Sequence, residues 1–256
     1  EEVATEGGVV MLALDTSLSM EADDVAPSRI DAAQEAAATF LESVPEGVRI
    51  GVVGFAGTAQ VLLDPTDDTA AVQRTIDRIQ LGEGTAIGEA VFSALDVFAN
   101  LDGDDEDDGD DDVVTGADAV EPAEGDALTG AVVLLSDGET TQGRTNDEAA
   151  KAALAQGVAV NTIAFGTDAG VVTGPDGVQI PVPVNRDALR ALADETGGRY
   201  FPAYTEAELK QVYEKLGESV ETETVHREVT DWFTFAAMAL ALLAGIGSLT
   251  WFSRLP

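Results

Sequence analysis

The chain has 256 residues, 45% of them hydrophobic, and its 48 acidic against 13 basic residues give a formal net charge of −35. This length allows one large domain, or two small ones, with a sizeable core. A surface this negative repels nucleic acid and anionic lipid headgroups, so DNA or RNA binding is excluded. Because the chain contains no cysteine, disulfide bridges, zinc–thiolate sites and cysteine nucleophiles are excluded as well.

An apolar run over residues 9–14 leads directly into the pattern Asp15-x-Ser17-x-Ser19. The run has the length and bounds of a fully buried strand in a parallel sheet, and open α/β sheets bind ligands at the ends of such strands. The three polar residues alternate, so their oxygens can converge in a loop. A carboxylate and two hydroxyls suit Mg²⁺ or Mn²⁺ better than zinc or copper. Taken alone, the motif equally fits a helix cap or a turn.

The rest of the chain alternates between helical and extended patterns. Apolar residues at helical spacing predict helices over residues 29–44, 72–79, 87–98, 147–156, 189–193 and 209–216. Apolar runs predict further strands over residues 48–55, 60–63, 132–135, 158–165 and 199–202. Residues 171–184, with turn residues at 174–177, predict an exposed hairpin. This alternation predicts an α/β, Rossmann-like, doubly wound and mostly parallel sheet covered on both faces.

Two of these segments carry further candidate ligands. Thr85 lies in a loop flanked by Gly82, Gly84 and Gly88, just before a predicted helix. A dinucleotide-binding loop is not indicated, because that fingerprint follows a strand and has different spacing. The glycines instead allow the backbone to carry Thr85 towards a site. The strand predicted at 132–135 is followed closely by Asp137.

The three stretches, which carry Asp15 to Ser19, then Thr85 and then Asp137, resemble in this order the metal-ion-dependent adhesion site (MIDAS) of von Willebrand factor type A (VWA) domains. The resemblance covers roughly residues 8–220 and implies a VWA fold with a Mg²⁺ site, Mn²⁺ and Ca²⁺ being alternatives. In the family the Ser and Thr hydroxyls contact the metal directly, and the Asp carboxylates act directly or through water. The implied metal-site residues are Asp15, Ser17, Ser19, Thr85 and Asp137. The hairpin, the run at 196–201 and the last predicted helix are similar to bacterial membrane-anchored Bat-type (aerotolerance) proteins and their actinobacterial relatives.

The acidic segment at 102–112 has nine acidic residues in eleven positions and begins an insertion that extends to about residue 126. Such dense like-charge runs are typically solvated, which predicts disorder. Weak calcium binding is the alternative, although the segment lacks a convincing EF-hand pattern.

Residues 232–252 contain no charge over 21 positions, about 32 Å as a helix, which is enough to cross a bilayer. Trp232, Phe233, Trp251 and Phe252 place aromatic side chains at both ends, as interfacial belts require. A buried core helix is the soluble alternative. We therefore predict a VWA domain over 1–220, a polar linker over 221–231 containing a solvated His226, a transmembrane helix over 232–252 and a tail over 253–256.

The first residue is Glu, so we expect a fragment or a processed product. The resemblance to Bat-type proteins implies a location at the cell membrane with the VWA domain outside the cytoplasm.

The site chemistry and the resemblance together predict a binding module without catalytic residues. Mg²⁺ retains waters, one of which an Asp or Glu of a partner protein can displace. The resemblance suggests other membrane VWA proteins or a MoxR-type ATPase system as partners, and the C-terminal helix would contact lipid. The alternative is a Mg²⁺-dependent hydrolase or phosphotransferase with Asp15 as nucleophile. That chemistry calls for a second carboxylate or a Lys near the phosphoryl group, and no basic residue accompanies the motifs. A purely structural VWA domain with an empty site would not need all five residues.

Overall fold

The computed structural model describes residues 8–103, 130–138, 140–174 and 176–219. The chain divides into two compact units, Glu1–Glu223 and Thr224–Pro256, and every described residue belongs to the first. The strands are β1 Val9–Asp15, β2 Arg49–Phe55, β3 Ala59–Thr66, β4 Gly130–Ser136, β5 Ala159–Phe165, β6 Val171–Thr173, β7 Gln179–Pro181 and β8 Tyr200–Ala203. The helices are η1 Leu18–Glu21, α1 Arg29–Ser43, α2 Thr69–Ile76, α3 Ile87–Gly103, α4 Asn146–Ala155, α5 Arg186–Thr196 and α6 Glu206–Ser219.

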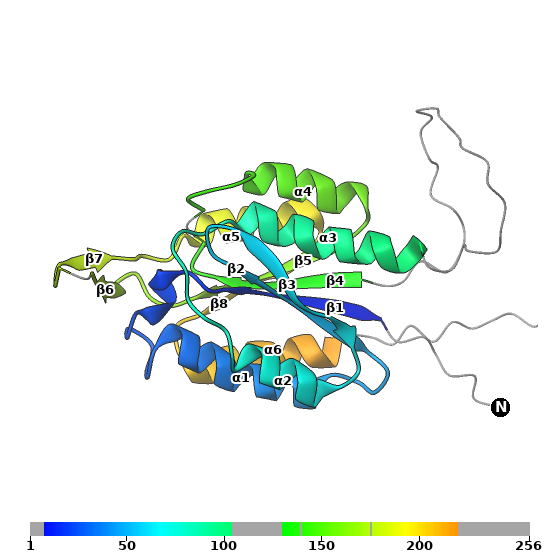
Figure 1. Ribbon diagram of the computed structural model, residues 1–256, viewed down its shortest axis with the longest axis horizontal. Helices are drawn as coiled ribbons and strands as arrows, with labels where there is room; N and C mark the ends of the chain where they lie inside the picture. The colour runs from blue at the N-terminus through cyan, green and yellow to red at the C-terminus, as the bar shows by residue number, and fades with distance from the viewer. Residues whose placement is uncertain (1–7, 104–129, 139, 175, 220–256) are drawn as a thin grey trace, which may run out of the picture. The chain divides into compact units, whose positions relative to one another are not determined.

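Six of the strands form one sheet in the order β3-β2-β1-β4-β5-β8 (Figure 1). Only the edge strand β3 runs antiparallel, and every other neighbouring pair is parallel. The chain builds the sheet outward from β1 in one direction, then returns to add β4 on the other side of β1. In open α/β sheets, this reversal of strand order leaves a crevice at the carboxyl ends of the two central strands. The predicted doubly wound, mostly parallel sheet is confirmed.

Helices cover both faces of the sheet, with α1, α2 and α6 on one face and α3, α4 and α5 on the other (Figure 1). Alternate residues of β1 therefore enter two different cores: Leu12 and Leu14 pack with the first helix layer, and Met11 and Ala13 with the second. All seven residues of β1 are buried. This two-sided burial explains why the strand reads as a continuous apolar run rather than as an alternating one.

Local signals in the sequence set the ends of several helices. Ser28 caps α1 by accepting a hydrogen bond from the Asp31 amide. Thr145 and Glu148 form a reciprocal capping box at the start of α4. Gly197 ends α5 in the left-handed region, with φ of 72°. The predicted helices accordingly agree with the observed ones to within a few residues.

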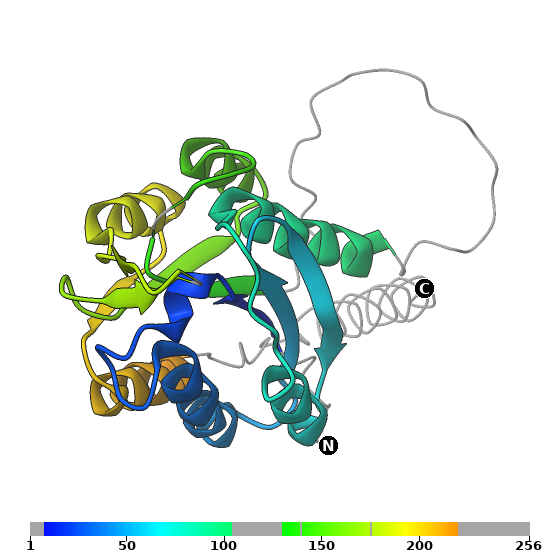
Figure 2. The same ribbon diagram turned by 60° about the vertical axis from the view of Figure 1, so that its left-hand side comes forward.

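The predicted hairpin is present as β6 and β7, which pair antiparallel in a two-stranded sheet of their own. Figure 2 shows this hairpin beside the short helix η1, at the end of the sheet where β1 finishes. No sequence pattern predicts η1. The hairpin therefore lies at the same end of the sheet as the candidate site.

Three predictions concern residues outside the described part of the chain. They are the disorder of most of the acidic insertion, the polar linker and the transmembrane helix at 232–252. Within the described ranges, no helix is both long and apolar enough to cross a bilayer.

Candidate metal centre

Asp15 is the last residue of β1, and its carboxylate is completely buried. Ser136, which ends the neighbouring strand β4, donates its hydroxyl to Asp15 Oδ2 at 2.5 Å. The Ser17 amide donates to Asp15 Oδ1 at 2.8 Å. Both carboxylate oxygens are thus held by groups from the ends of the two central strands. No sequence motif points to Ser136 as a part of the site.

The two serines of the motif lie close together directly after β1. Ser17 is buried and Ser19 is partly exposed, and their hydroxyl oxygens are 2.8 Å apart. The tight turns of η1, which begins at Leu18, keep the two hydroxyls on one side of the loop. The structure therefore brings the three residues of the first motif together as predicted.

The Thr85 loop is joined to this motif by backbone pairing. Gly82 forms a parallel bridge with Ser17, in which the Leu18 amide donates to the Gly82 carbonyl at 3.0 Å. The Gly82 amide donates in turn to the Thr16 carbonyl at 2.8 Å. Thr85 follows three residues later and is 4% exposed. The loop that carries Thr85 therefore lies against the loop that carries the serines.

A second set of hydrogen bonds joins Thr85 to the loop that follows β4. The Thr85 amide donates to Thr141 Oγ1 at 2.9 Å, and the Thr141 amide donates to the Thr85 carbonyl at 2.9 Å. Gly84 has a φ of +79°, and a Cβ there would lie 2.4 Å from Gln142 Nε2. The glycine is needed for its backbone conformation, as expected for a loop that positions Thr85.

Asp137 follows β4 and is 1% exposed. Its Oδ2 lies 3.1 Å from Arg29 Nη1. The expectation that no basic residue accompanies the motifs is therefore wrong. Arg29 is the first residue of α1 and is completely buried. The helical pattern gives no sign of this, because a charged residue in the first turn of a helix is usually solvated.

The other two nitrogen atoms of the Arg29 guanidinium also donate hydrogen bonds. Its Nε and Nη2 atoms bind the two oxygens of Asp24 at 2.8 and 2.9 Å, and Nη2 donates to the Val182 carbonyl at 3.0 Å. A Cβ at Gly166 would lie 2.5 Å from Arg29 Nε, and one at Gly170 would lie 2.1 Å from Nη2. The backbone before the hairpin thus packs directly on the guanidinium group, which links Asp137 to the hairpin.

The carboxylates of this region differ in their electrostatics. Burial, followed by repulsion from Asp137, raises the pKa of Asp15 to about 7, against the smaller opposing effect of hydrogen bonds from Ser136 and Ser17. Burial also acts to raise the pKa of Asp24, but hydrogen bonds from Arg29 and Thr167 outweigh it and lower that pKa below its ordinary value. A bound cation would stabilise the ionised form of Asp15, which the metal-free protein disfavours.

The donor set fits a hard divalent cation. Within the described ranges, no three His, Cys, Asp or Glu side chains cluster as a metal site. The candidate centre instead combines the Asp15 carboxylate with neighbouring hydroxyls, which are oxygen ligands of the kind that Mg²⁺ accepts. That Ser17, Ser19 and Thr85 are direct ligands, with Asp15 and Asp137 completing the site directly or through water, stays a prediction of the family resemblance.

Residues 10–140 match the family model described as the von Willebrand factor type A domain. The chain belongs to this family. The matched region of the VWA domain contains all five residues of the candidate centre and ends shortly after Asp137. A UPF0353 protein of Mycolicibacterium vanbaalenii is 39% identical over 255 residues, covering 97% of this chain and 71% of that protein.

Solved structures agree with this assignment. BatB of Bacteroides thetaiotaomicron superposes on the VWA domain with a TM-score of 0.62 at 25% identity, covering 83% of this chain and 98% of that one. An aerotolerance-related membrane protein of Bacteroides fragilis gives a TM-score of 0.64 at 26% identity, covering 82% and 98%. The resemblance to VWA domains and Bat-type proteins is confirmed.

A more distant structure of the same fold contains a metal in its MIDAS motif. Proximal thread matrix protein 1 of the mussel byssus, with a zinc-occupied MIDAS motif, gives a TM-score of 0.55 at 17% identity. It covers 84% of this chain and 46% of that one, and at this identity the comparison shows a shared fold only.

Proposed function

We propose that this chain is a membrane-anchored VWA domain that binds a partner protein through a divalent metal ion. An Asp or Glu of the partner completes the coordination of the metal. The hydroxyls of Ser17, Ser19 and Thr85 are the direct ligands, while Asp15 and Asp137 hold the geometry. The general role agrees with the VWA family, whose domains typically mediate protein–protein interactions.

This proposal rests on the burial and the electrostatics of Asp15. Its carboxylate is buried and has a pKa of about 7, and no Lys or Arg of the described residues forms an ion pair with it. A buried carboxylate without a counter-ion is costly, and a divalent cation relieves that cost. The adjacent hydroxyls of Ser17 and Ser19 supply further hard oxygen ligands. The zinc in the mussel protein's MIDAS supports divalent binding by this fold, and we propose Mg²⁺ for this chain.

Arg29 makes the proposed cation more attractive to an acidic partner. Because Arg29 already neutralises Asp137, the ion is balanced mainly by Asp15 and by neutral hydroxyls. The remaining positive charge favours a carboxylate from outside. Nucleic acid is excluded as a partner by the net charge of −35. Another membrane VWA protein or a MoxR-type ATPase system are the partners that the Bat-type resemblance suggests.

The position of Arg29 beside Asp137 bears on the enzymatic alternative, because a hydrolase or phosphotransferase needs a cation near the phosphoryl group. However, the guanidinium is 0% exposed and already binds Asp24, Asp137 and the Val182 carbonyl. It has no free face for a substrate. We therefore propose a binding function rather than catalysis.

Membrane anchoring is supported by the uncharged stretch at 232–252 and by the description of the Bacteroides fragilis structure as a membrane protein. We propose that this stretch anchors the domain in the cell membrane, with the domain outside the cytoplasm.

The test is a pull-down from solubilised membranes with the full chain as bait, in Mg²⁺ and in EDTA. We expect Mg²⁺-dependent capture that is lost in Asp15→Ala and in Thr85→Ala. Asp194→Ala, which removes an exposed carboxylate on α5, is the matched control and retains capture. Capture that survives EDTA and both site variants contradicts the metal bridge.

A further inference from the structure

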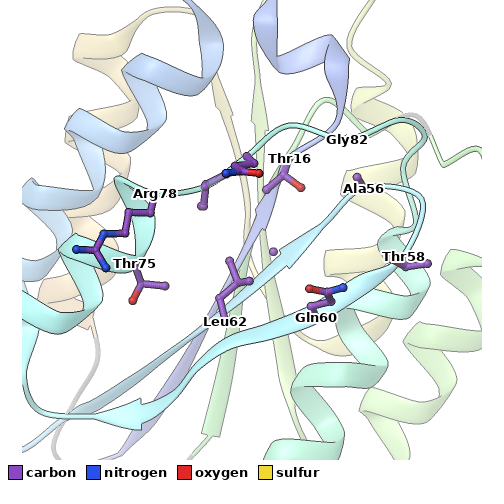
Figure 3. Close-up of a pocket in the computed structure, with 11 residues that line it drawn as sticks. Thr16, Ala56, Thr58, Gln60, Leu62, Thr75, Arg78 and Gly82 are labelled. Carbon is purple, nitrogen blue, oxygen red and sulfur yellow. The ribbon is translucent and has the colours of Figure 1, made fainter.

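A pocket of about 500 Å³ opens beside the candidate metal centre (Figure 3). Its walls come from the loop after β1, from the β2–β3 hairpin and from the end of α2. Figure 3 shows Arg78 and Thr75 on one side of the pocket and Gln60 on the other, with Leu62 between them. This volume lies within the range of about 300–1,000 Å³ that is typical of ligand-binding pockets.

The pocket and the metal centre share one stretch of backbone. Thr16 lines the pocket and stands between two residues of the metal motif, Asp15 and Ser17. Gly82 also lines the pocket and forms the backbone bridge with Ser17. A polypeptide bound to a metal at Ser17 therefore has the pocket beside it, and each further extended residue advances it by about 3.3 Å.

The charge of the pocket differs from that of the whole chain. The chain has 48 acidic residues, yet none of the eleven residues that line the pocket is acidic. The one ionisable lining residue is Arg78, which is exposed and forms no ion pair with any other described residue. In contrast, Arg74 on the same helix is paired with Asp68. A carboxylate approaching Arg78 meets a free guanidinium without a competing acid in the pocket wall.

We propose that this pocket receives the segment of the partner next to its metal-binding acidic residue, and that a second carboxylate in this segment binds Arg78. The partner is thus a protein with an acidic segment rather than with a single exposed carboxylate. This inference rests on the proposed function, because the metal bond places the segment over the pocket. The polar side chains of Gln60 and Thr75 offer hydrogen bonds to the segment, and Leu62 offers an apolar contact.

The test uses random twelve-residue peptides displayed on phage and selected on the full chain in detergent micelles with Mg²⁺. We expect the enriched peptides to carry two acidic positions at a fixed spacing. In Arg78→Gln, enrichment of one position should fall by about fivefold while the other is kept, since a charge-assisted hydrogen bond at an exposed site is lost. Arg74→Gln, the matched control on the same helix, should keep both positions.

Three outcomes would overturn the proposal. A single enriched acidic position, or two positions whose enrichment is unchanged in Arg78→Gln, would show that the pocket does not bind a second carboxylate. Selection that is insensitive to EDTA and to Asp15→Ala would instead contradict the metal bridge itself. An absence of any enriched peptide would contradict the metal bridge as well. The two failures are thus distinguishable, and thermal unfolding of Arg78→Gln confirms that its fold is retained.

Discussion

Asp15 and Asp137 leave neighbouring strands at the same end of the sheet and are equally buried, but their surroundings are opposite. Asp137 has a buried arginine against it, whereas the partners that the described residues give Asp15 are hydroxyl and amide groups. Within the described part of the chain, one carboxylate thus has a counter-ion and the other has none. We interpret this asymmetry as the reason why the site can bind a metal ion. Asp15 stays available to an external cation, while Arg29 neutralises Asp137 and keeps the local negative charge low.

The largest effect is expected when the ion pairs of Arg29 are removed. Arg29→Met should lower the free energy of unfolding by about 3–5 kcal/mol, because it takes the guanidinium away from the buried Asp137 and the partly buried Asp24. Urea denaturation in EDTA measures this loss. Arg29→Lys is the control: it keeps the charge but not the planar fork of donors, so we expect a smaller loss. A loss below about 1 kcal/mol in Arg29→Met would mean that the contacts of Arg29 with Asp24 and Asp137 contribute little to the stability of the domain.

A gain in stability, rather than a loss, is expected when the charge of Asp15 is removed. In EDTA at pH 8, Asp15→Asn should raise the free energy of unfolding by about 2 kcal/mol, because it removes a buried charge. The folded-state pKa of about 7 lies above the ordinary value of 3.8, so the folded state holds a proton that the unfolded state has released between these pH values. The stability of the wild-type protein relative to Asp15→Asn must therefore fall as pH rises from about 4 to 7.

Asp137→Asn is the matched comparison for this experiment. It leaves the buried Arg29 with one charged acceptor fewer, so we expect a loss of stability where Asp15→Asn gives a gain. If both variants shift the unfolding midpoint in the same direction at pH 8, the two carboxylates are not electrostatically distinct. If the advantage of Asp15→Asn is equally large at pH 4, the raised pKa is not its cause.

Sequence patterns sufficed for the parts of the fold that local physics determines. The runs of β1 and β4 are apolar because both faces are buried, and Gly197 marks the end of α5 through its backbone conformation. The five candidate ligands also came from the sequence, but through their resemblance to a family motif rather than through periodicity. The glycines around Thr85 supplied the only local signal for that position.

The missing parts of the site depend on tertiary contacts. Arg29 meets Asp137 across 108 positions of sequence, and Ser136 meets Asp15 across 121. Arg29 occupies the first turn of a helix and Ser136 the end of a strand, where solvent-exposed polar residues are common. No pattern within a window of sequence separates these buried residues from exposed ones. Such partners emerge only when the packing of α1 against the sheet is known.

The most direct test of the central claim is the position of the metal. We expect crystals of the full chain grown with Mn²⁺ to give an anomalous difference peak at about 2.0–2.4 Å from the hydroxyl oxygens of Ser17, Ser19 and Thr85. The same experiment on Asp15→Asn should give no peak there. A peak elsewhere, such as at the acidic run 102–112, with none at the ends of β1 and β4 would contradict the account.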